Sequence, residues 1–362
     1  MAERSGVQTP QVSSTSAQQA GPRTPVGIAA RMPGLALAAA IAVVATMVGK
    51  LFPVVGGPVT GIVLGVLVAA VIKPGKRLRP GISTAGKFVL QVSVVALGSQ
   101  LSLGQIVRVG VGSLPVMLGS LAVCLLAAYW IGRWLGVIGD VRTLIGVGTG
   151  ICGASAIAAV TPVIGAVGVE VAYAISTIFL FNIAAVLTFP FLGHLLGMSQ
   201  HTFGLFAGTA VNDMSSVVAA ATTYGPAATS YAVVVKLTRT LLIIPICLGL
   251  AALAGRRRTA VGGQPDTVAK PRLRVWKLVP WFLVGFLLVA GANSAGLIPQ
   301  GAHAGLDEAS IFLITVALSA IGLSTDLTSL RRTGSRPLIL GACLWVVVSC
   351  TSLGLQFLFA SA

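Results

Sequence analysis

Long apolar stretches alternate with short polar ones along most of the chain, and this pattern predicts the architecture. A helix needs about 20 apolar residues to cross a hydrocarbon core about 30 Å thick. Eleven segments meet or nearly meet this requirement, at residues 33–51, 54–72, 86–103, 114–135, 144–167, 171–192, 203–222, 231–253, 275–297, 309–327 and 337–360. The chain is therefore predicted to be all-α, a polytopic bundle of about 10–11 transmembrane helices.

The polar segments between these predicted spans orient them. Lys and Arg gather after the second, fourth, eighth and tenth spans, whereas the segments after the odd-numbered spans hold only Lys50 and Arg108. Because positive residues stay on the cytoplasmic side of a membrane, the N-terminus is predicted to be cytoplasmic and the C-terminus to lie outside.

Two polar stretches set the domain organisation. Residues 1–32 are rich in Ser, Gln, Thr and Pro and contain no apolar core, which is typical of a disordered tail. Residues 254–274 form a basic cytoplasmic loop inside an otherwise single transmembrane domain at 33–362.

Composition supports the membrane class. Hydrophobic residues make up 56% of the chain and charged residues only 9%, whereas soluble domains carry about 25% charged residues. The formal net charge of +16 could suggest a nucleic-acid partner. Most of the basic residues lie in short runs between apolar segments, however, so we interpret them as topology signals and predict no nucleic-acid binding.

The chain resembles itself at long range. Leu101, Ser102 and the motif GSxPxxLG at 112–119 recur as Leu323, Ser324 and the same motif at 334–341. The match relates the third predicted span to the tenth. Since a shift of seven spans is odd, the two copies would face opposite ways, as in the inverted repeats of secondary transporters.

A second pair of segments is closer in sequence. GTGICGASAI at 148–157 matches GTAVNDMSSV at 208–217 without a gap. These segments lie in the fifth and seventh predicted spans, a shift of two. An even shift would make the two copies parallel, which does not fit an inversion. Two alternatives stay open: one segment is re-entrant, or one predicted boundary is wrong.

Both members of this pair are poor lipid-facing helices. Gly150 and Gly153 interrupt the fifth predicted span, and Asn212 and Asp213 lie in the middle of the seventh. Broken helices at membrane depth occur only where protein or a watery cavity covers the backbone. Their helix N-termini attract anions and their freed carbonyls attract cations. The alternative is that these glycines only permit close helix packing.

Ionisable residues inside predicted spans give a sharper signal, because each costs roughly 2.5–3.5 kcal/mol at the centre of a membrane helix. Asp213 is one, and Lys236 and Arg239 share a face of the next span. They could form a structural salt bridge, or the two bases could hold an anion while Asp213 carries a coupling proton. The predicted substrate-binding set is Gly150, Cys152, Gly153, Ser155, Asn212, Asp213, Ser215, Ser216, Lys236 and Arg239.

The sequence contains no motif of a membrane enzyme, such as HExxH or GxSxG, and no ATP-binding loop. We therefore predict a protein that is not an enzyme, with no cofactor and no metal. Coupling to an ion gradient is favoured over ATP, and no filter motif indicates a channel.

Three motifs carry a family resemblance: GICGASAIAAVTPVI at 150–164, FAGTAVNDMSSVVAAATTYG at 206–225 and VVVKLTRTLL at 233–242. With them the chain, from about residue 33 to its end, resembles the YeiH-like sulfate exporter family of bacterial multi-pass membrane proteins. More distantly it is similar to the bile-acid symporter type of fold, which implies inverted repeats with two crossed broken helices.

The resemblance implies an exporter of a small anion, sulfate or an organosulfonate, in the inner (plasma) membrane of a bacterium. The expected partners are this anion, a coupling H⁺ or Na⁺, the lipid bilayer and, as an open alternative, further copies of the chain. An ion-coupled carrier of another small organic acid, a channel and a receptor-like membrane protein are the alternatives.

Overall fold

The computed structural model describes residues 28–51, 56–72, 74–75, 77–137, 140–250, 280–324 and 335–360. Within these ranges the chain is helical and contains no strand. The elements are α1 (Ile28–Leu51), α2 (Gly56–Ile72), α3 (Arg79–Thr84), the π-helix η1 (Ala85–Val89), α4 (Leu90–Leu97), the 3₁₀-helix η2 (Gly98–Gln100), α5 (Leu103–Trp134), α6 (Asp140–Gly150), α7 (Ala154–Ile164), α8 (Gly168–Leu195), α9 (Gln200–Ala210), α10 (Met214–Tyr224), α11 (Pro226–Leu241), α13 (Trp281–Ser294), α14 (Gln300–Ser324) and α16 (Ser335–Ala360).

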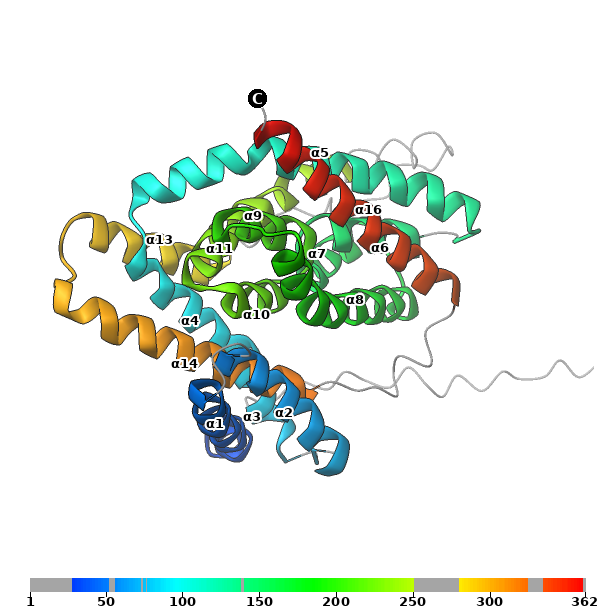
Figure 1. The fold of residues 1–362 in the computed structure, drawn as a ribbon. Helices are drawn as coiled ribbons and strands as arrows, with labels where there is room; N and C mark the ends of the chain where they lie inside the picture. The colour runs from blue at the N-terminus through cyan, green and yellow to red at the C-terminus, as the bar shows by residue number, and fades with distance from the viewer. Residues whose placement is uncertain are drawn as a thin grey trace, which may run out of the picture.

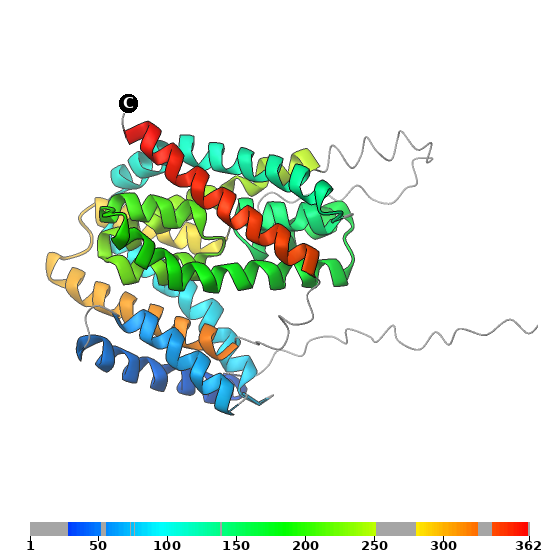
Figure 2. The same ribbon diagram turned by 45° about the vertical axis from the view of Figure 1, so that its right-hand side comes forward.

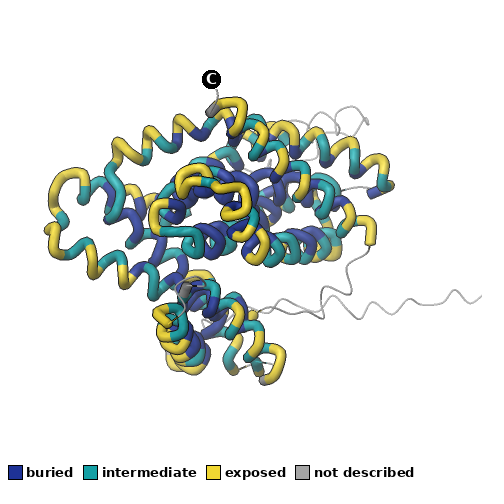
Figure 3. The backbone as a smooth tube through the Cα atoms, viewed as in Figure 1, coloured by how far each residue is buried: buried dark blue, intermediate teal, exposed yellow. Residues whose placement is uncertain are grey.

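The predicted class, a polytopic helical membrane protein, is confirmed. Among the described residues, seven helical segments are long and apolar enough to cross a membrane. One of them continues α11 as far as Leu250. Large apolar side chains such as Trp134 and Phe357 lie exposed on the outer surface, where lipid would cover them. Figure 3 shows exposed positions along the outer helices and buried ones at the centre.

The helices form two packed groups. In Figures 1 and 2, α1, α2 and α14 lie together below the rest, and α4 leads from them towards the second group. The second group contains α5 to α11 and α16. An apolar cluster that includes Val94, Val218, Leu237 and Leu318 joins the two groups.

Small residues hold α2 and α14 in backbone contact. Gly57 and Gly61 face Thr315 on α14, and Gly65 faces Ser319 and Gly322. A side chain at Gly65 would meet the backbone of α14 rather than a flexible side chain. Close approach of this kind lets membrane helices pack without a hydrophobic force between them.

We expect Gly65→Leu to lower the stability of the protein by about 1–3 kcal/mol or more, because the added side chain must push α2 away from α14. The measurement is the midpoint of thermal unfolding of the purified protein in detergent. Gly112→Leu is the matched control, since a Cβ at Gly112 meets nothing within 4 Å. Equal midpoints for the two variants would contradict the packing argument.

Helices α9 and α10 form a hairpin that returns to the side it entered from. Tyr224, at the end of α10, donates a hydrogen bond to the carbonyl oxygen of Met198 at 2.5 Å, just before α9 begins. The ring of Tyr224 also stacks on Phe203, with centroids 3.9 Å apart. Helix α11 then starts beside the start of α9, where Gln200 Oε1 accepts from the backbone N–H of Ala227 at 3.0 Å.

Helices α6 and α7 also form a hairpin, the first of the two in chain order, so that α9 and α10 form the second. The side chain of Ile157 on α7 reaches back to Gly148 on α6. Val160 of α7 belongs to the same apolar cluster as Val137, which lies just before α6, and Val141, which lies in its first turn. The chain therefore reverses between Gly150 and Ala154. In Figure 1 this hairpin lies to the right of the α9–α10 hairpin.

The two hairpins enter from opposite faces of the bundle, because the single long helix α8 lies between them in the chain. This settles the alternatives left by the sequence. The fifth and seventh predicted spans are not full crossings, and both are re-entrant. The repeat extends to the helix boundaries: α6 and α9 begin 60 residues apart (140 and 200), as do α7 and α10 (154 and 214). The even shift arose because the predicted spans counted each hairpin as a crossing, and the two copies are inverted rather than parallel.

The long-range repeat is inverted, as predicted. Gly119 on α5 faces Leu355 on α16, and Gly132 on α5 faces Leu340 on α16. The two helices that carry the GSxPxxLG motif therefore run antiparallel. The crossed broken helices implied by the bile-acid symporter resemblance are replaced here by two hairpins that meet at their tips.

The ends of the predicted elements differ by a few residues. Helix α1 begins at Ile28, so the predicted tail at 1–32 overlaps the first helical turn. Residues 1–27 of that tail and the basic loop at 254–274 lie outside the described residues.

Candidate functional site

The tip of the first hairpin is the segment from Ile151 to Gly153. Its backbone N–H at Gly153 donates to the carbonyl oxygen of Gly148 at 2.9 Å. Gly153 adopts φ +68° and ψ −132°, a region that side-chain-bearing residues rarely occupy. A Cβ at this position would also lie 3.2 Å from the Cβ of Asp213. Glycine therefore permits both the reversal of the chain and the contact with the second hairpin.

We expect Gly153→Ala to destabilise the folded protein by about 1–3 kcal/mol, because alanine must adopt a strained backbone conformation against Asp213. The effect is measured as a lower midpoint of thermal unfolding in detergent. Gly168→Ala serves as control, since nothing lies within 4 Å of a Cβ there. An unchanged midpoint in Gly153→Ala would show that the tip can relax around a side chain.

The tip of the second hairpin is the segment from Val211 to Asp213. The backbone N–H of Asn212 donates to Asn182 Oδ1 on α8 at 3.1 Å, and both asparagines are buried. Asp213 caps the start of α10: its Oδ2 accepts from Ser216 N at 3.4 Å and from the hydroxyl of Ser215. Such a cap satisfies N–H groups that the first turn of a helix leaves free.

Lys236 joins the two tips. Its side chain is fully buried. The Nζ atom donates to the carbonyl oxygen of Ile151 at 2.9 Å and to that of Val211 at 2.8 Å. Ile151 and Val211 occupy the same position in the two hairpins, just after the ends of α6 and α9. The ammonium group therefore bridges two equivalent carbonyls of the inverted repeat.

Arg239, one helical turn further along α11, is also fully buried. Its Nε donates to the carbonyl oxygen of Gly150 at 2.8 Å, one terminal nitrogen donates to that of Thr209, and the other donates to that of Thr149 at 3.4 Å. These carbonyls belong to the last turns of α6 and α9. Positive charge at a helix C-terminus is favourable because the free carbonyls carry partial negative charge.

The contacts of the charged side chains differ from the salt bridge that was one of the two predicted arrangements. In the described part of the chain no ion pair joins Asp213 to Lys236 or Arg239: the carboxylate caps its own helix, and the two cations bind backbone carbonyls. The sequence could not show this, because carbonyl partners depend only on where the backbone is broken. Asn182 was missed, although a lone polar residue in the apolar run FLFNIAAV could have indicated it.

The remaining predicted residues surround the same tips. Cys152 is buried, whereas Ser155 is exposed and its hydroxyl donates within its own turn, to the carbonyl oxygen of Cys152 at 2.8 Å. Ser215 and Ser216 are partly buried at the first turn of α10. The structure thus brings all the predicted substrate-binding residues to one region, where the hairpins meet.

Two acceptor oxygens at the second tip have no partner. Asn212 Oδ1 and Asp213 Oδ1 are buried and accept no hydrogen bond in the described structure. Buried polar atoms without partners are costly and rare. These acceptor oxygens at a helix break indicate a place where a proton, or a hydrogen-bond donor of a ligand, can complete the hydrogen bonding.

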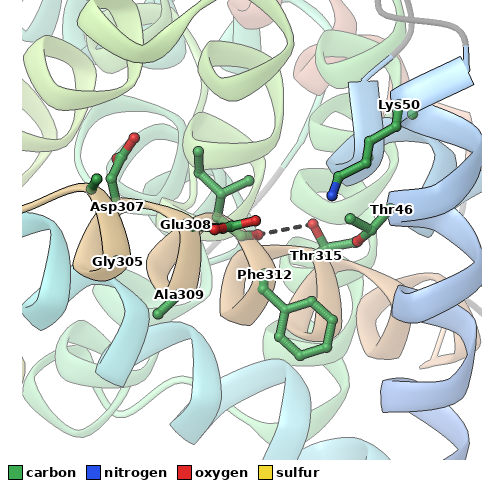
Figure 4. Close-up of a pocket in the computed structure, with 12 residues that line it drawn as sticks. Thr46, Lys50, Gly305, Asp307, Glu308, Ala309, Phe312 and Thr315 are labelled. Atoms are coloured by element: carbon green, nitrogen blue, oxygen red, sulfur yellow. Dashed lines mark hydrogen bonds between the residues drawn. The ribbon is translucent and has the colours of Figure 1, made fainter.

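A pocket of about 690 Å³ lies elsewhere, between the end of α1, the start of α2 and the first part of α14. Figure 4 shows Lys50 on the α1 side, with Asp307 and Glu308 on the α14 side. None of the predicted substrate-binding residues lines it, so this pocket is separate from the site at the hairpin tips.

These features define a polytopic helical membrane protein with two inverted helical hairpins whose tips meet inside the bundle. The comparisons with known proteins agree with this class. The family described as conserved hypothetical protein 698 matches residues 33–341.

The relatives are membrane proteins of similar length. The UPF0324 membrane protein of Streptococcus pyogenes serotype M3 is 42% identical over 334 residues, covering 90% of this chain and 96% of the relative. That of Streptococcus mutans is 42% identical over 341 residues, with 91% and 97% covered. That of Fusobacterium nucleatum is 40% identical over 343 residues, with 89% and 96% covered. The chain belongs to this family, and the resemblance to YeiH-like proteins is confirmed.

Proposed function

We propose that this protein is a secondary transporter of a small anion, with its substrate site where the two hairpin tips meet. The observation that supports it is the geometry of the inverted hairpins: they enter from opposite faces and end together at buried, polar backbone. In secondary transporters the substrate lies at the interface of inverted repeats, beside the ends of discontinuous helices.

An anion fits this place better than a cation. Helices α7 and α10 both begin at the tips, so the positive ends of their dipoles face the same region. The start of α7 has no side-chain cap from Gly153. Its first N–H groups, apart from that of Ala156, which bonds to the side chain of Cys152, can therefore bind an oxyanion. Lys236, Arg239 and Asp213 together leave a formal excess of one positive charge. Sulfate or an organosulfonate is the substrate class that the family resemblance favours.

The basic side chains would act on the anion through their charge, since their donors bind carbonyls of the hairpins. Direct contacts would come from N–H groups of α7 and from the hydroxyl of Ser216. The hydroxyls of Ser155 and Ser215 donate to Cys152 and to Asp213, so they would contact the anion by exchanging these acceptors for it. Asp213 Oδ1 is the place for a coupling proton. Protonation removes the negative charge that opposes the anion, so proton and anion favour each other's binding, and the direction of net transport follows the two gradients.

Counterflow in proteoliposomes tests the proposal. Vesicles with purified protein, preloaded with unlabelled sulfate, taurine or a carboxylate, should accumulate the same labelled anion transiently and saturably, whereas empty vesicles should not. Flux that does not saturate would support a channel. Saturable binding of an anion without any flux would support a receptor-like protein.

We expect Asp213→Asn to retain measurable anion binding but to lose the dependence of that binding on pH, because the exchangeable proton is removed. Binding of sulfate or taurine to the purified variant is measured from about pH 5 to 8, the range in which most proteins are stable. Glu170→Gln is the control, because Glu170 lies at the start of α8 and its Oε2 accepts from Val167 N at 3.3 Å. A pH dependence that survives in Asp213→Asn would place the coupling proton elsewhere.

A further inference from the structure

The carbonyl oxygens at the two hairpin tips form a cage for a cation. A helix that ends inside a membrane leaves its last carbonyls without intrahelical partners. Here α6 and α9 both end at the centre of the bundle. The carbonyls of Thr149, Gly150 and Ile151 from the first hairpin therefore face those of Thr209 and Val211 from the second. Transporters with broken helices use carbonyls of this kind to coordinate Na⁺.

In this protein the cage is filled by its own side chains. Lys236 Nζ lies between the equivalent carbonyls of Ile151 and Val211, at 2.9 and 2.8 Å. A position that bridges two symmetry-related carbonyls is where a single shared cation would bind. Arg239 donates to neighbouring carbonyls of both hairpins, those of Gly150 and Thr209. The side chains of Lys236 and Arg239 are both fully buried.

We propose that Lys236 and Arg239 are tethered cations that replace a coupling Na⁺ at the hairpin tips, so that the protein binds no Na⁺ there and works without a Na⁺ gradient. The proposal rests on the carrier function for its consequence in transport. The replacement itself is a property of the folded protein and can be tested without transport.

Two further features support this assignment. The cations enter from α11, which packs along α9, with Gly204 and Gly208 of α9 against Tyr231 and Val235 of α11. The ammonium and guanidinium groups are thus carried by a neighbouring helix rather than by the hairpins. In addition, neither cation is neutralised by an ion pair within the described structure. Their positive charges are balanced by the carbonyl dipoles of two helix C-termini, as a bound Na⁺ would be.

The test asks whether a small cation from solution restores the stability of a variant in which Lys236 no longer fills the carbonyl site. Lys236→Ala removes the ammonium group and leaves the carbonyls of Ile151 and Val211 facing an open space. The midpoint of thermal unfolding is measured in detergent at constant ionic strength, in NaCl, KCl, NH₄Cl or choline chloride. Lys87→Ala is the matched control, since it removes the same charge from an exposed position on η1.

In choline chloride we expect Lys236→Ala to unfold about 5 °C or more below wild type, because hydrogen bonds to a charged group are lost. Na⁺ or NH₄⁺ should recover much of this loss saturably, whereas choline, which is too large for the cage, should not. Wild type and Lys87→Ala should show no difference between NaCl and choline chloride.

Two results would overturn the proposal. One is a Lys236→Ala variant that gains nothing from any of the small cations. The other is a wild-type protein that Na⁺ stabilises saturably over choline, and this measurement needs no variant, so it stands even if Lys236→Ala fails to fold.

Counterflow of the wild type in Na⁺-free choline medium separates this inference from the carrier function. Equal flux with and without Na⁺ is expected. A requirement for Na⁺ would refute the tethered-cation proposal and leave the carrier in place, whereas absence of flux in both media would refute the carrier and leave the rescue result intact.

Discussion

Arg239→Gln should be among the most damaging single changes in this protein, with an expected loss of about 4 kcal/mol or more of folding free energy. The guanidinium group binds carbonyls of both hairpins, and a bond to a charged donor contributes about 1.5–3 kcal/mol. Glutamine can replace at most part of these bonds, so buried carbonyls would be left without a donor. The measurements are the midpoint of thermal unfolding in detergent and the yield of monodisperse protein.

Two comparisons make this prediction specific. Arg108→Gln makes the same substitution at an exposed position of α5 and should change the midpoint little. Arg239→Lys keeps the charge but loses the planar fork of donors, so it should fall between wild type and Arg239→Gln.

The same variant tests the salt-bridge alternative. If Asp213 and Arg239 were a buried ion pair, adding Asp213→Asn to Arg239→Gln would restore much of the lost stability, because the cost lies in the charge left alone. We expect no such recovery, since Asp213 caps α10 and Arg239 binds carbonyls. A double variant as stable as wild type would contradict the hydrogen-bond assignment.

The hairpin topology predicts an all-or-none labelling result. In a cysteine-free background, Val167→Cys should react with a membrane-impermeant maleimide from the same side as Arg133→Cys, because α6 and α7 enter and leave on one face. Leu196→Cys and Ala227→Cys, both at exposed positions, should react from the other side, because these residues lie just before and just after the second hairpin. The readout is the fraction labelled in right-side-out and inside-out vesicles.

Full crossings would give the opposite pattern, which makes the experiment decisive. Residue 167 would then lie across the membrane from Arg133, and residue 196 across from Ala227. The basic side of the bundle should be the protected one in intact cells, as the distribution of Lys and Arg predicts.

The sequence alone determined the membrane class and most of the helices. Apolar runs of about 20 residues have one stable outcome in lipid, because a helix is the single-segment structure that satisfies every backbone group there. The inverted relation of α5 and α16 was also visible, because the GSxPxxLG pattern occurs twice, at 112–119 and 334–341. Glycines and polar residues inside apolar runs also predicted two helix breaks, one at Gly150 and Gly153 and one at Asn212 and Asp213.

Only the tertiary structure decided what the breaks do. A helix of about 11 residues, a break and another such helix has the length and hydropathy of one continuous span, so sequence could not distinguish a crossing from a hairpin. The partners of Lys236 and Arg239 were equally hidden. Their partners are backbone carbonyls, which every residue has, and only the folded chain determines which of them a helix end leaves free.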